Sequence, residues 1–239
     1  MQKEAAKLKT EKEKQKAFVE YYRSDRFKSE IALPNKSSFH HFRFEFFSEN
    51  KLFRRIKEVI ENEKKLVTVV QRNCPKNVFF TPVKWLDPVN LRRKKDKDVK
   101  DYMLSSPLFF DIDMQLISPP TLTSALETTE RLIDCIEEKT TRKPDWIVFS
   151  GSRGFHVYYW EWDDIVRQYC SADMRIAAFI RERKRLLAFL NKKGVIVDFS
   201  VTADPWRLLR VPGTLHGESG FIAKVFKSLD GFSIDKVKF

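Results

Sequence analysis

The stretch LFFDIDM at residues 108–114 decides the fold that the sequence predicts. Its apolar residues predict a buried strand, in which successive side chains point to opposite faces of a sheet. Asp111 and Asp113 are two residues apart, so both carboxylates leave the same face while Ile112 points into the core. Two like charges this close repel each other unless a cation compensates them. The pair therefore indicates a hard divalent ion such as Mg²⁺ or Mn²⁺, which binds carboxylate oxygens.

A third acidic residue strengthens this interpretation. An Asp-x-Asp tripeptide alone also occurs where a strand simply carries polar residues on a wet face. Here the flanking residues are strongly apolar, and Asp198 lies in the equally apolar stretch VIVDFS at 195–200. Three carboxylates can hold two divalent ions about 3.5–4 Å apart, which is the arrangement that activates a 3′-hydroxyl and binds a triphosphate.

Downstream of this strand, the hydrophobic pattern alternates between helix and strand. A strand followed by a helix begins a βαβ-like unit. The expected elements are a helix at 121–139 with Leu122, Leu126, Ile133 and Ile136 on one face, strands at 145–150 and 155–160 around a glycine turn at 151–154, a basic helix at 174–193 ended by Gly194, a strand at 195–200 and β structure at 221–226.

Upstream, the apolar spacing predicts a further helix and strand. An amphipathic helix begins at Ser48, a strand spans 77–83, and the charged run at 92–101 connects to the Asp-x-Asp strand; the helix would use Leu52, Phe53, Ile56, Val59 and Ile60. The predicted fold class is α/β in the mixed α+β sense, with a predominantly antiparallel or mixed central sheet and helices packed outside it.

The composition indicates a folded, basic protein. The 239 residues include 42% hydrophobic residues and only 7 Gly and 10 Pro, which excludes a disordered or fibrous chain. There are 45 Lys and Arg against 33 Asp and Glu, a net charge of +12. This surplus favours an anionic partner such as nucleic acid, nucleotide or membrane surface, although a well-solvated surface would carry the same charge. We predict a charged helix or tail at 1–17 and one domain at 18–239.

Targeting signals and cysteine patterns are absent from the sequence. No apolar run approaches the ~20 residues of a membrane span, and the N-terminus lacks the apolar middle of a signal peptide. We therefore expect an intracellular protein, cytoplasmic if archaeal, with no membrane partner. Cys74, Cys135 and Cys170 form no close pair, so the sequence spells out neither a disulfide framework nor a zinc site.

Two turns combine glycine, arginine and histidine. In SGSRGFH at 150–156, small residues let backbone N–H groups approach an anion beside Arg153 and His156. An ordinary glycine turn with a strand histidine is the alternative. RLLRVPGTLHG at 207–217 repeats the combination shortly after Asp198. Carboxylates for metal, followed twice by Arg and His on glycine turns, are what nucleotidyl transfer from a triphosphate requires.

Together these motifs resemble the small, catalytic subunit of archaeo-eukaryotic DNA primases. That family has an Asp-x-Asp strand, then Ser-Gly-x-Arg-Gly-x-His, then a single Asp leading into Arg-Leu-x-Arg-x-Pro-Gly-[Ser/Thr]-Leu-His-Gly, and all three blocks occur here in order. Weaker similarity at 43–46 (RFEF) and 77–88 (NVFFTPVKWLDP) extends the resemblance over most of residues 18–226. It implies the primase catalytic core, an RRM-like mixed sheet flanked by helices.

The resemblance also implies roles for individual residues. The metal ligands and catalytic residues would be Asp111, Asp113 and Asp198, with Asp204 as second choice for the third ligand. The nucleotide-binding residues would be Ser150, Arg153, His156, Arg210, His216 and Arg43. The implied cofactor is Mg²⁺ or Mn²⁺ in a two-metal site. The family's zinc-knuckle cluster of cysteine and histidine is missing, so we predict no structural zinc.

The function implied by the resemblance is that of a DNA primase catalytic subunit, a nucleotidyltransferase that makes short primers on template. Its partners would be single-stranded DNA, nucleoside triphosphates and a primase large subunit or equivalent domain. The chain is short for the family, so the docking surface for a large subunit is expected to be reduced or altered.

Three other functions use similar residues. A primase-polymerase or repair polymerase of the same superfamily would extend existing strands, and a test without a supplied 3′-end discriminates it. A two-metal nuclease also needs acids near a basic groove, but hydrolysis does not call for two Arg/His phosphate sites. A non-catalytic nucleic-acid-binding module would satisfy the charge but would leave the apolar-flanked acids unexplained.

Overall fold

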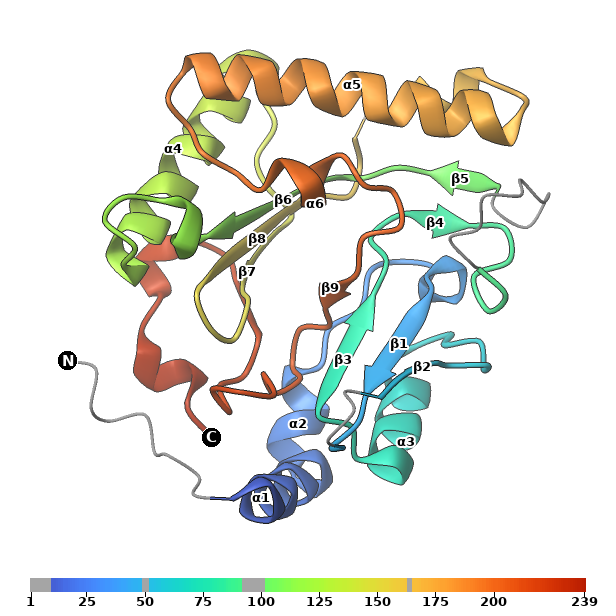
Figure 1. The fold of residues 1–239 in the computed structure, drawn as a ribbon, viewed down its shortest axis with the longest axis vertical. Coiled ribbons are helices and arrows are strands. Elements are labelled where there is room, and N and C mark those ends of the chain that lie inside the picture. The colour runs from blue at the N-terminus through green and yellow to red at the C-terminus, as the bar shows by residue number, and fades with distance from the viewer. Residues whose placement is uncertain (1–9, 49–51, 92–101, 163–164) are drawn as a thin grey trace.

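The structure, a computed structural model, describes residues 10–48, 52–91, 102–162 and 165–239. Its strands form two four-stranded sheets and one two-stranded sheet, and the pairings among these described strands are antiparallel. Figure 1 shows one large sheet above α1, α2 and α3 and the other beneath α4 and α5. The predicted mixed, largely antiparallel fold class is confirmed, but the single central sheet that we expected is divided in two.

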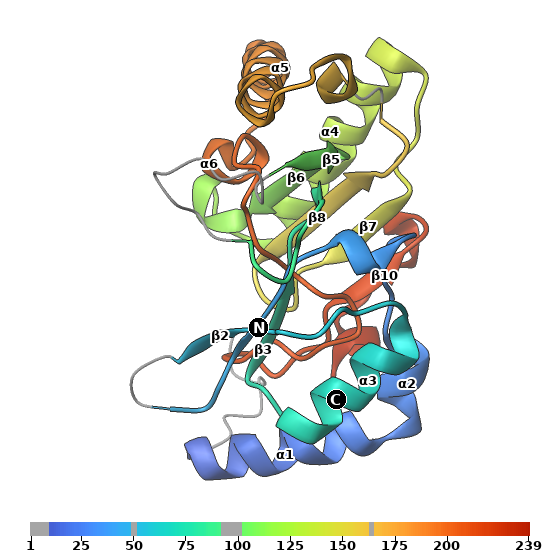
Figure 2. The same ribbon diagram turned by 90° about the vertical axis from the view of Figure 1, so that its right-hand side faces the viewer.

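The first sheet has the strand order β2-β1-β3-β9. Its core is closed by α1, α2 and α3, whose buried aromatic and aliphatic side chains join those of the strands in one cluster; Figure 2 shows these helices together at one end of the molecule. The elements are α1 (Glu11–Arg23), α2 (Asp25–Glu30), β1 (Phe42–Glu45), β2 (Phe53–Arg55), α3 (Glu63–Asn73), β3 (Asn77–Phe80) and β9 (Leu209–Arg210). Strand β9 pairs with β3 from far along the chain.

The second sheet has the order β10-β7-β8-β6 and carries the Asp-x-Asp sequence. Because β6 and β7 both pair antiparallel with β8, they run in the same direction, and α4 connects them in a split βαβ unit. The elements are β6 (Leu108–Asp113), α4 (Leu122–Thr140), β7 (Trp146–Phe149), β8 (Gly154–Tyr159), α5 (Ala172–Lys192) and β10 (Lys224–Phe226). The predicted strands and the hairpin turn between β7 and β8 are confirmed.

Side-chain alternation separates the two faces of this sheet. Ile112 on β6 and Phe155 on β8 belong to the apolar cluster under α4 and α5. On the opposite face, Phe109 and Tyr158 join the cluster shared with the first sheet. Since alternate residues share a face, Asp111 leaves the strand on the side of the first sheet. The sequence pattern therefore places the acids between the two sheets.

The two long helices begin and end within two residues of the predicted bounds, 121–139 and 174–193. The side chains of Thr121 and Ser171 cap α4 and α5 by accepting hydrogen bonds from backbone N–H groups three residues later. Gly194 follows α5 with φ of 71°. Arg183 anchors α5 to the sheet, because its fully buried guanidinium donates to the carbonyl oxygens of residues 106 and 107.

Short elements complete the described chain. Strands β4 and β5 form the two-stranded sheet, and α6 follows Asp198. Their bounds, with those of the 3₁₀ helices, are η1 (Ser37–Phe39), β4 (Lys84–Trp85), β5 (Met103–Ser105), η3 (Met114–Leu116), η4 (Ile165–Gln168), α6 (Phe199–Thr202), η5 (Leu229–Gly231) and η6 (Ile234–Val237). Within the described residues, no helix has the length and apolar character needed to cross a membrane. The charged connection at 92–101 lies outside the described residues.

The N-terminal helix α1 crosses the boundary that we predicted between residues 17 and 18. Its polar first turns lead directly into Phe18, Tyr21 and Tyr22, which are buried in the core. The Tyr21 hydroxyl donates a 2.7 Å hydrogen bond to the carbonyl oxygen of Gly213, in the turn of the second basic motif. Residues 11–23 thus act as one element, and the domain division stays a prediction.

The predicted helix from Ser48 to Ile60 is wrong. Phe53 begins β2 instead and pairs with Glu45 on β1, and the helix starts later, after the Asn62 cap, as α3. Phe53 and Val59 remain 48% and 45% exposed. Apolar residues at helical spacing require a core to cover, and here the backbone pairing with β1 prevailed over the spacing.

The predicted strand at 195–200 is also wrong. Asp198 is the N-cap of α6, and its Oδ1 accepts hydrogen bonds from the N–H groups of Ser200 and Val201. An aspartate side chain readily accepts hydrogen bonds from nearby backbone N–H groups in this way. Aspartate is therefore favoured at helix N-caps and disfavoured inside strands. A single backbone hydrogen bond, from the Asp198 N–H to the Asp111 carbonyl at 2.9 Å, still fixes this segment beside β6.

Candidate active site

Three carboxylates from two separate segments lie together between the sheets. Asp111 and Asp113 occupy alternate positions of β6, and Asp198 is joined to β6 by its backbone hydrogen bond to Asp111. Burial, followed by the charges of Asp198 and Asp113, raises the pKa of Asp111 to about 7. Asp111 is thus electrostatically coupled to both of the other acids, although Asp198 comes from a distant part of the chain.

The outer two acids are partly held by local hydrogen bonds. Asp113 Oδ1 accepts the Gln115 N–H at 2.9 Å, while its Oδ2 lies 3.4 Å from Arg153 Nη2. Asp198 Oδ1 accepts the N–H and the hydroxyl of Ser200 at 2.8 and 2.7 Å. These contacts orient the carboxylates of Asp113 and Asp198, and none of them is made to the carboxylate of Asp111.

The donor set fits a hard divalent cation. Mutually repelling carboxylates are stabilised by such an ion, which prefers oxygen ligands. In the described parts of the chain, however, no three acidic, histidine or cysteine side chains already stand close enough to one another to hold an ion. Metal binding would therefore require Asp111, Asp113 and Asp198 to turn toward a common point.

The first glycine turn joins β7 to β8 next to these acids. Gly151 has φ of 89°, a left-handed conformation that favours glycine, and the Ser150 N–H donates to the Gly154 carbonyl at 2.9 Å. Gly154 lies so close to β6 that an added Cβ would stand 1.7 Å from the Ile112 oxygen. Arg153 projects from the turn with 45% of its side chain exposed, so its guanidinium can reach an anion.

The second turn presents a neutral histidine. His216 Nδ1 accepts hydrogen bonds from the N–H groups of Glu218 and Ser219, both at 3.2 Å. Burial, followed by the charge of Arg210, lowers the pKa of His216 to about 3. The ring is therefore neutral with its proton on Nε2, which makes that nitrogen a hydrogen-bond donor.

The two turns are in direct contact. An added Cβ on Gly151 would stand 2.8 Å from His216 Cβ and 3.2 Å from the Phe221 carbonyl oxygen. The Ser219 hydroxyl also donates to the Gly151 carbonyl oxygen. Arg153 and His216, which the sequence placed on separate motifs, are thus carried by one connected structure.

A substitution at Gly151 tests this contact. We expect Gly151→Ala to raise the KM for nucleoside triphosphate by about ten-fold or more, because the new methyl group displaces His216 and strains the backbone by about 1–3 kcal/mol. Steady-state kinetics would measure it. Gly220→Ala is the matched control, since Gly220 also has a positive φ but meets no atom within 4 Å. Equal effects from both replacements would mean that strain alone, and not contact with His216, is responsible.

Arg210 is buried and links the two sheets through its hydrogen bonds. Its Nε donates to the Ser150 carbonyl at 3.1 Å, and its Nη1 donates to Asn77 Oδ1 and to the Leu215 carbonyl at 2.5 and 3.2 Å. Only 7% of the residue is exposed, and burial lowers its pKa to about 10. Two of its nitrogens therefore hold protein atoms, and phosphate contact by the rest of the group stays a prediction.

Asn77 is the side chain that accepts the hydrogen bond of Arg210. Its Oδ1 accepts from Arg210 and from the Gly217 N–H at 2.7 Å, while its Nδ2 donates to Glu45 Oε2 at 2.7 Å. The buried amide thus connects β1, β3 and β9 with the His216 turn. No sequence motif marks Asn77, because its partners lie 32, 133 and 140 positions away.

His156 lies beneath the acids rather than in an open phosphate site. It is opposite Asp111 in the β6–β8 register, its Nε2 is 3.5 Å from Asp111 Oδ1, and it is 5% exposed. Burial, followed by the charges of Arg210 and Arg207, lowers the pKa of His156 to about 3. The neutral ring therefore supports Asp111, and its predicted contact with a nucleotide stays untested.

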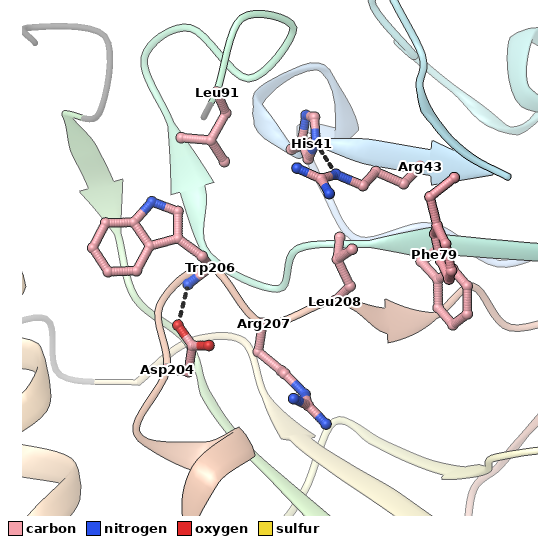
Figure 3. A pocket seen from close by; sticks show the side chains of 9 residues that line it. His41, Arg43, Phe79, Leu91, Asp204, Trp206, Arg207 and Leu208 are labelled. Carbon is pink, nitrogen blue, oxygen red and sulfur yellow. Dashed lines mark hydrogen bonds between the residues drawn. The ribbon is translucent and has the colours of Figure 1, made fainter. Parts of the chain in front are cut away.

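Arg43 lines a cavity of about 360 Å³. The arginine Nε donates to His41 Nε2 at 3.0 Å (Figure 3). On the other side of the ring, His41 Nδ1 donates to the Pro88 carbonyl oxygen. The other residues lining the cavity are Phe53, Phe79, Leu91, Asp204, Trp206, Arg207 and Leu208. Of these, Arg207 lies near enough to the acids to lower the pKa of Asp111, so the cavity adjoins the carboxylates.

Asp204 faces this cavity rather than the acid cluster. Its Oδ1 accepts the Trp206 N–H at 3.0 Å, as Figure 3 shows. Asp198, but not Asp204, is among the charges that raise the pKa of Asp111. Asp198 is thus the acid whose charge acts on Asp111, and the choice of Asp198 as third ligand stays a prediction. From the sequence alone, His41 and Asn77 were not identified as parts of the site. Arg207 was recognised as part of the second basic motif but was given no role.

Comparisons with known proteins agree with the resemblance. No family model matches the chain. DNA primase small subunit PriS of Saccharolobus islandicus is 24% identical, with 90% of this chain and 78% of that protein covered. PriS of Pyrobaculum islandicum is 25% identical over 76% of this chain and 69% of that protein. The polymerase domain of Mycobacterium tuberculosis ligase D, solved with DNA, shares the fold with a TM-score of 0.54 at 12% identity, covering 93% of this chain and 86% of that one. The chain is thus similar in sequence to archaeal primase small subunits over most of its length.

Proposed function

We propose that this chain is the catalytic subunit of a DNA primase, which makes short primers from nucleoside triphosphates on single-stranded DNA by two-metal nucleotidyl transfer. The observation that carries the proposal is the convergence of Asp111, Asp113 and Asp198 beside two connected glycine turns. The similarity to primase small subunits supports the same role.

In this proposal the chain's own residues bind and orient the reactants. Arg153 and the Nε2–H of His216 hold the triphosphate, with the turn backbone around Gly151 as further donor. Asp111, Asp113 and Asp198 hold Mg²⁺ or Mn²⁺. When bound, the ions activate the 3′-hydroxyl and neutralise charge on the triphosphate. Holding the reacting atoms in line is the protein's main contribution.

The cavity beside the acids is suited to the sugar and base of the nucleotide. Its apolar wall includes Phe79 and Leu208, and its polar wall includes Arg43 and Asp204. A cavity that combines flat apolar surface with a few polar groups is typical of small-molecule sites. We assign Arg43 to nucleotide binding on this basis, with His41 as the group that orients it.

Template and partner follow from the same proposal. The net charge of +12 favours a polyanionic template. A large subunit, or an equivalent domain, is the proposed protein partner, as it is implied by the small-subunit relatives.

The test is primer synthesis by the purified chain on single-stranded DNA, with labelled nucleoside triphosphates and Mg²⁺ or Mn²⁺. New oligonucleotides without a supplied 3′-end, lost in the Asp113→Asn variant, are expected. Extension of supplied primers only would indicate a polymerase instead. No incorporation by the chain, even with a primase large subunit from Saccharolobus islandicus, would contradict the proposal.

A further inference from the structure

A groove runs between α5 and the segment that leads to Asp198. It encloses about 240 Å³ and lies away from the nucleotide cavity, with which it shares no lining residue. The residues that matter for its character are Lys184, Leu187, Val195, Ile196, Val197 and Phe199. Its walls are thus largely apolar, with a cation at the edge.

Two large apolar side chains of this groove are turned to solvent. Ile196 is 45% exposed and Phe199 is 51% exposed. A single exposed apolar residue is ordinary, but two of them lining one groove mark a contact surface. Phe199 is the first residue of α6, so the ring stands on a short helix that Asp198 caps.

The flank of the groove on α5 carries exposed cations, one of which, Arg181, also donates a 3.1 Å hydrogen bond to the Tyr169 hydroxyl. Arg181, Lys184 and Lys192 are exposed, and their spacing of three and eight residues places them on one face of the helix, over about 16 Å of its length. Within the described residues, Lys184 and Lys192 form no ion pair. The next residue, Lys193, is directed toward α4 instead, where its Nζ lies 3.3 Å from Glu138 Oε2.

The groove also adjoins the reaction centre. Val197 and Phe199 line it, and Asp198 between them is joined to Asp111 by the backbone hydrogen bond. A nucleic-acid strand whose end lies at the three carboxylates must continue over a neighbouring surface of the protein. This groove is such a surface.

We propose that the groove binds single-stranded nucleic acid, with one base stacked on Phe199 and the backbone phosphates along Arg181, Lys184 and Lys192. An exposed aromatic ring bordered by a row of cations is the usual site for single strands, because each base has a face that can stack and each phosphate a charge. A stretch of about 16 Å matches several nucleotides at roughly 3.4 Å each. The inference rests on the proposed function, and it names where the strand lies.

Charge decides between this occupant and a protein helix. An apolar helix would fill the groove but would leave the cations of α5 without counter-charge. A strand of nucleic acid satisfies both features, since its bases cover Phe199 and Ile196 while its phosphates meet Lys184.

Binding of a fluorescein-labelled oligothymidylate to the full chain, measured by anisotropy without nucleotide or metal, tests the proposal. We expect Phe199→Ala to weaken binding about ten-fold and Phe199→Trp to restore it, because stacking needs a ring. Lys184→Glu should weaken binding and lower the slope of log K against log salt by about one or more. Lys64→Glu is the charge-matched control, on α3 at the other end of the molecule (Figure 1).

The outcomes separate this proposal from the proposed function. If Phe199→Ala, Lys184→Glu and Lys64→Glu bind alike while primer synthesis proceeds, the groove proposal is overturned and the enzyme stands. If Phe199→Ala instead abolishes self-association seen by light scattering, a second copy of the chain occupies the groove. Loss of synthesis in Asp111→Ala with unchanged oligonucleotide binding would support both proposals. Melting temperatures within about 2 °C of the wild type exclude misfolding.

Discussion

Replacing Asp111 with asparagine is expected to abolish nucleotide incorporation and, without metal, to make the folded protein more stable above pH 7. Loss of one carboxylate from a metal site removes several kcal/mol of transition-state stabilisation, so incorporation should fall by about a thousand-fold or more. The amide keeps the shape of the side chain and removes its charge. Stability and activity should therefore change in opposite directions.

The pH dependence follows from the direction of the pKa shift. The pKa of Asp111 is about 7 in the folded protein, against about 3.9 in an unfolded chain. Between these values the folded state holds the proton more tightly, so stability falls as pH rises from about 4 to about 7. The asparagine variant lacks this decline and should be more stable by about 1–3 kcal/mol at pH 8. Near pH 4 the two proteins should differ little.

Thermal unfolding in chelator between pH 4 and pH 8 measures this effect. Asp134→Asn, on the exposed face of α4, is the matched control and should show no gain. Adding Mg²⁺ should then stabilise the wild type more than the Asp111→Asn variant, because bound cation replaces the missing counter-charge. A variant that is no more stable than the wild type at pH 8 would show that Asp111 is not under electrostatic strain.

The second large effect is expected at Asn77. Asn77→Leu leaves Arg210, the Gly217 N–H and Glu45 without their partner, and an unsatisfied buried group costs about 1–3 kcal/mol. We expect a loss of about 3 kcal/mol or more in unfolding free energy, which lowers the melting temperature by roughly 6–12 °C. The KM for nucleotide should rise as well, because the His216 turn loses its anchor.

A paired replacement distinguishes positioning from simple stability. Asn77→Asp keeps the acceptor for Arg210 but places a second carboxylate against Glu45, and it should be as damaging as Asn77→Leu. Adding Glu45→Gln restores a donor opposite the new acid at unchanged total charge. The double variant should recover most of the melting temperature and of the KM. If it recovers stability but not KM, Asn77 does not position the nucleotide site through hydrogen bonds.

The sequence predicted the acid pair of the site because its geometry is local. Strand alternation alone places Asp111 and Asp113 on one face, and the apolar flanks fix which face is buried. The helices α4 and α5 were equally predictable, since each is long, periodic and capped. Glycine turns were recognisable because Gly151 must adopt a positive φ.

The failures occurred where a local pattern fits more than one backbone conformation, or where the partners of a residue lie far apart in the chain. The apolar residues at 52–60 have helical spacing, but residues 53–55 form backbone hydrogen bonds with β1 and are therefore a strand. Asp198 was placed in a strand because the short apolar run at 195–197 cannot distinguish a strand from a segment that leads into a helix cap. Asn77 and His41 carry no motif of their own, and their importance appears only when β9 returns to β3.

The strand order of the two sheets bears on synthesis of the chain by the ribosome. Strand β9 pairs with β3, and β10 pairs with β7, so each sheet gains one strand from residues 209–226, which follow all of its other strands along the chain. Until those residues emerge, the nascent protein exposes two unpaired strand edges, which readily associate with other chains. A chain truncated before residue 209 would therefore lack the last strand of both sheets, and we expect it to aggregate.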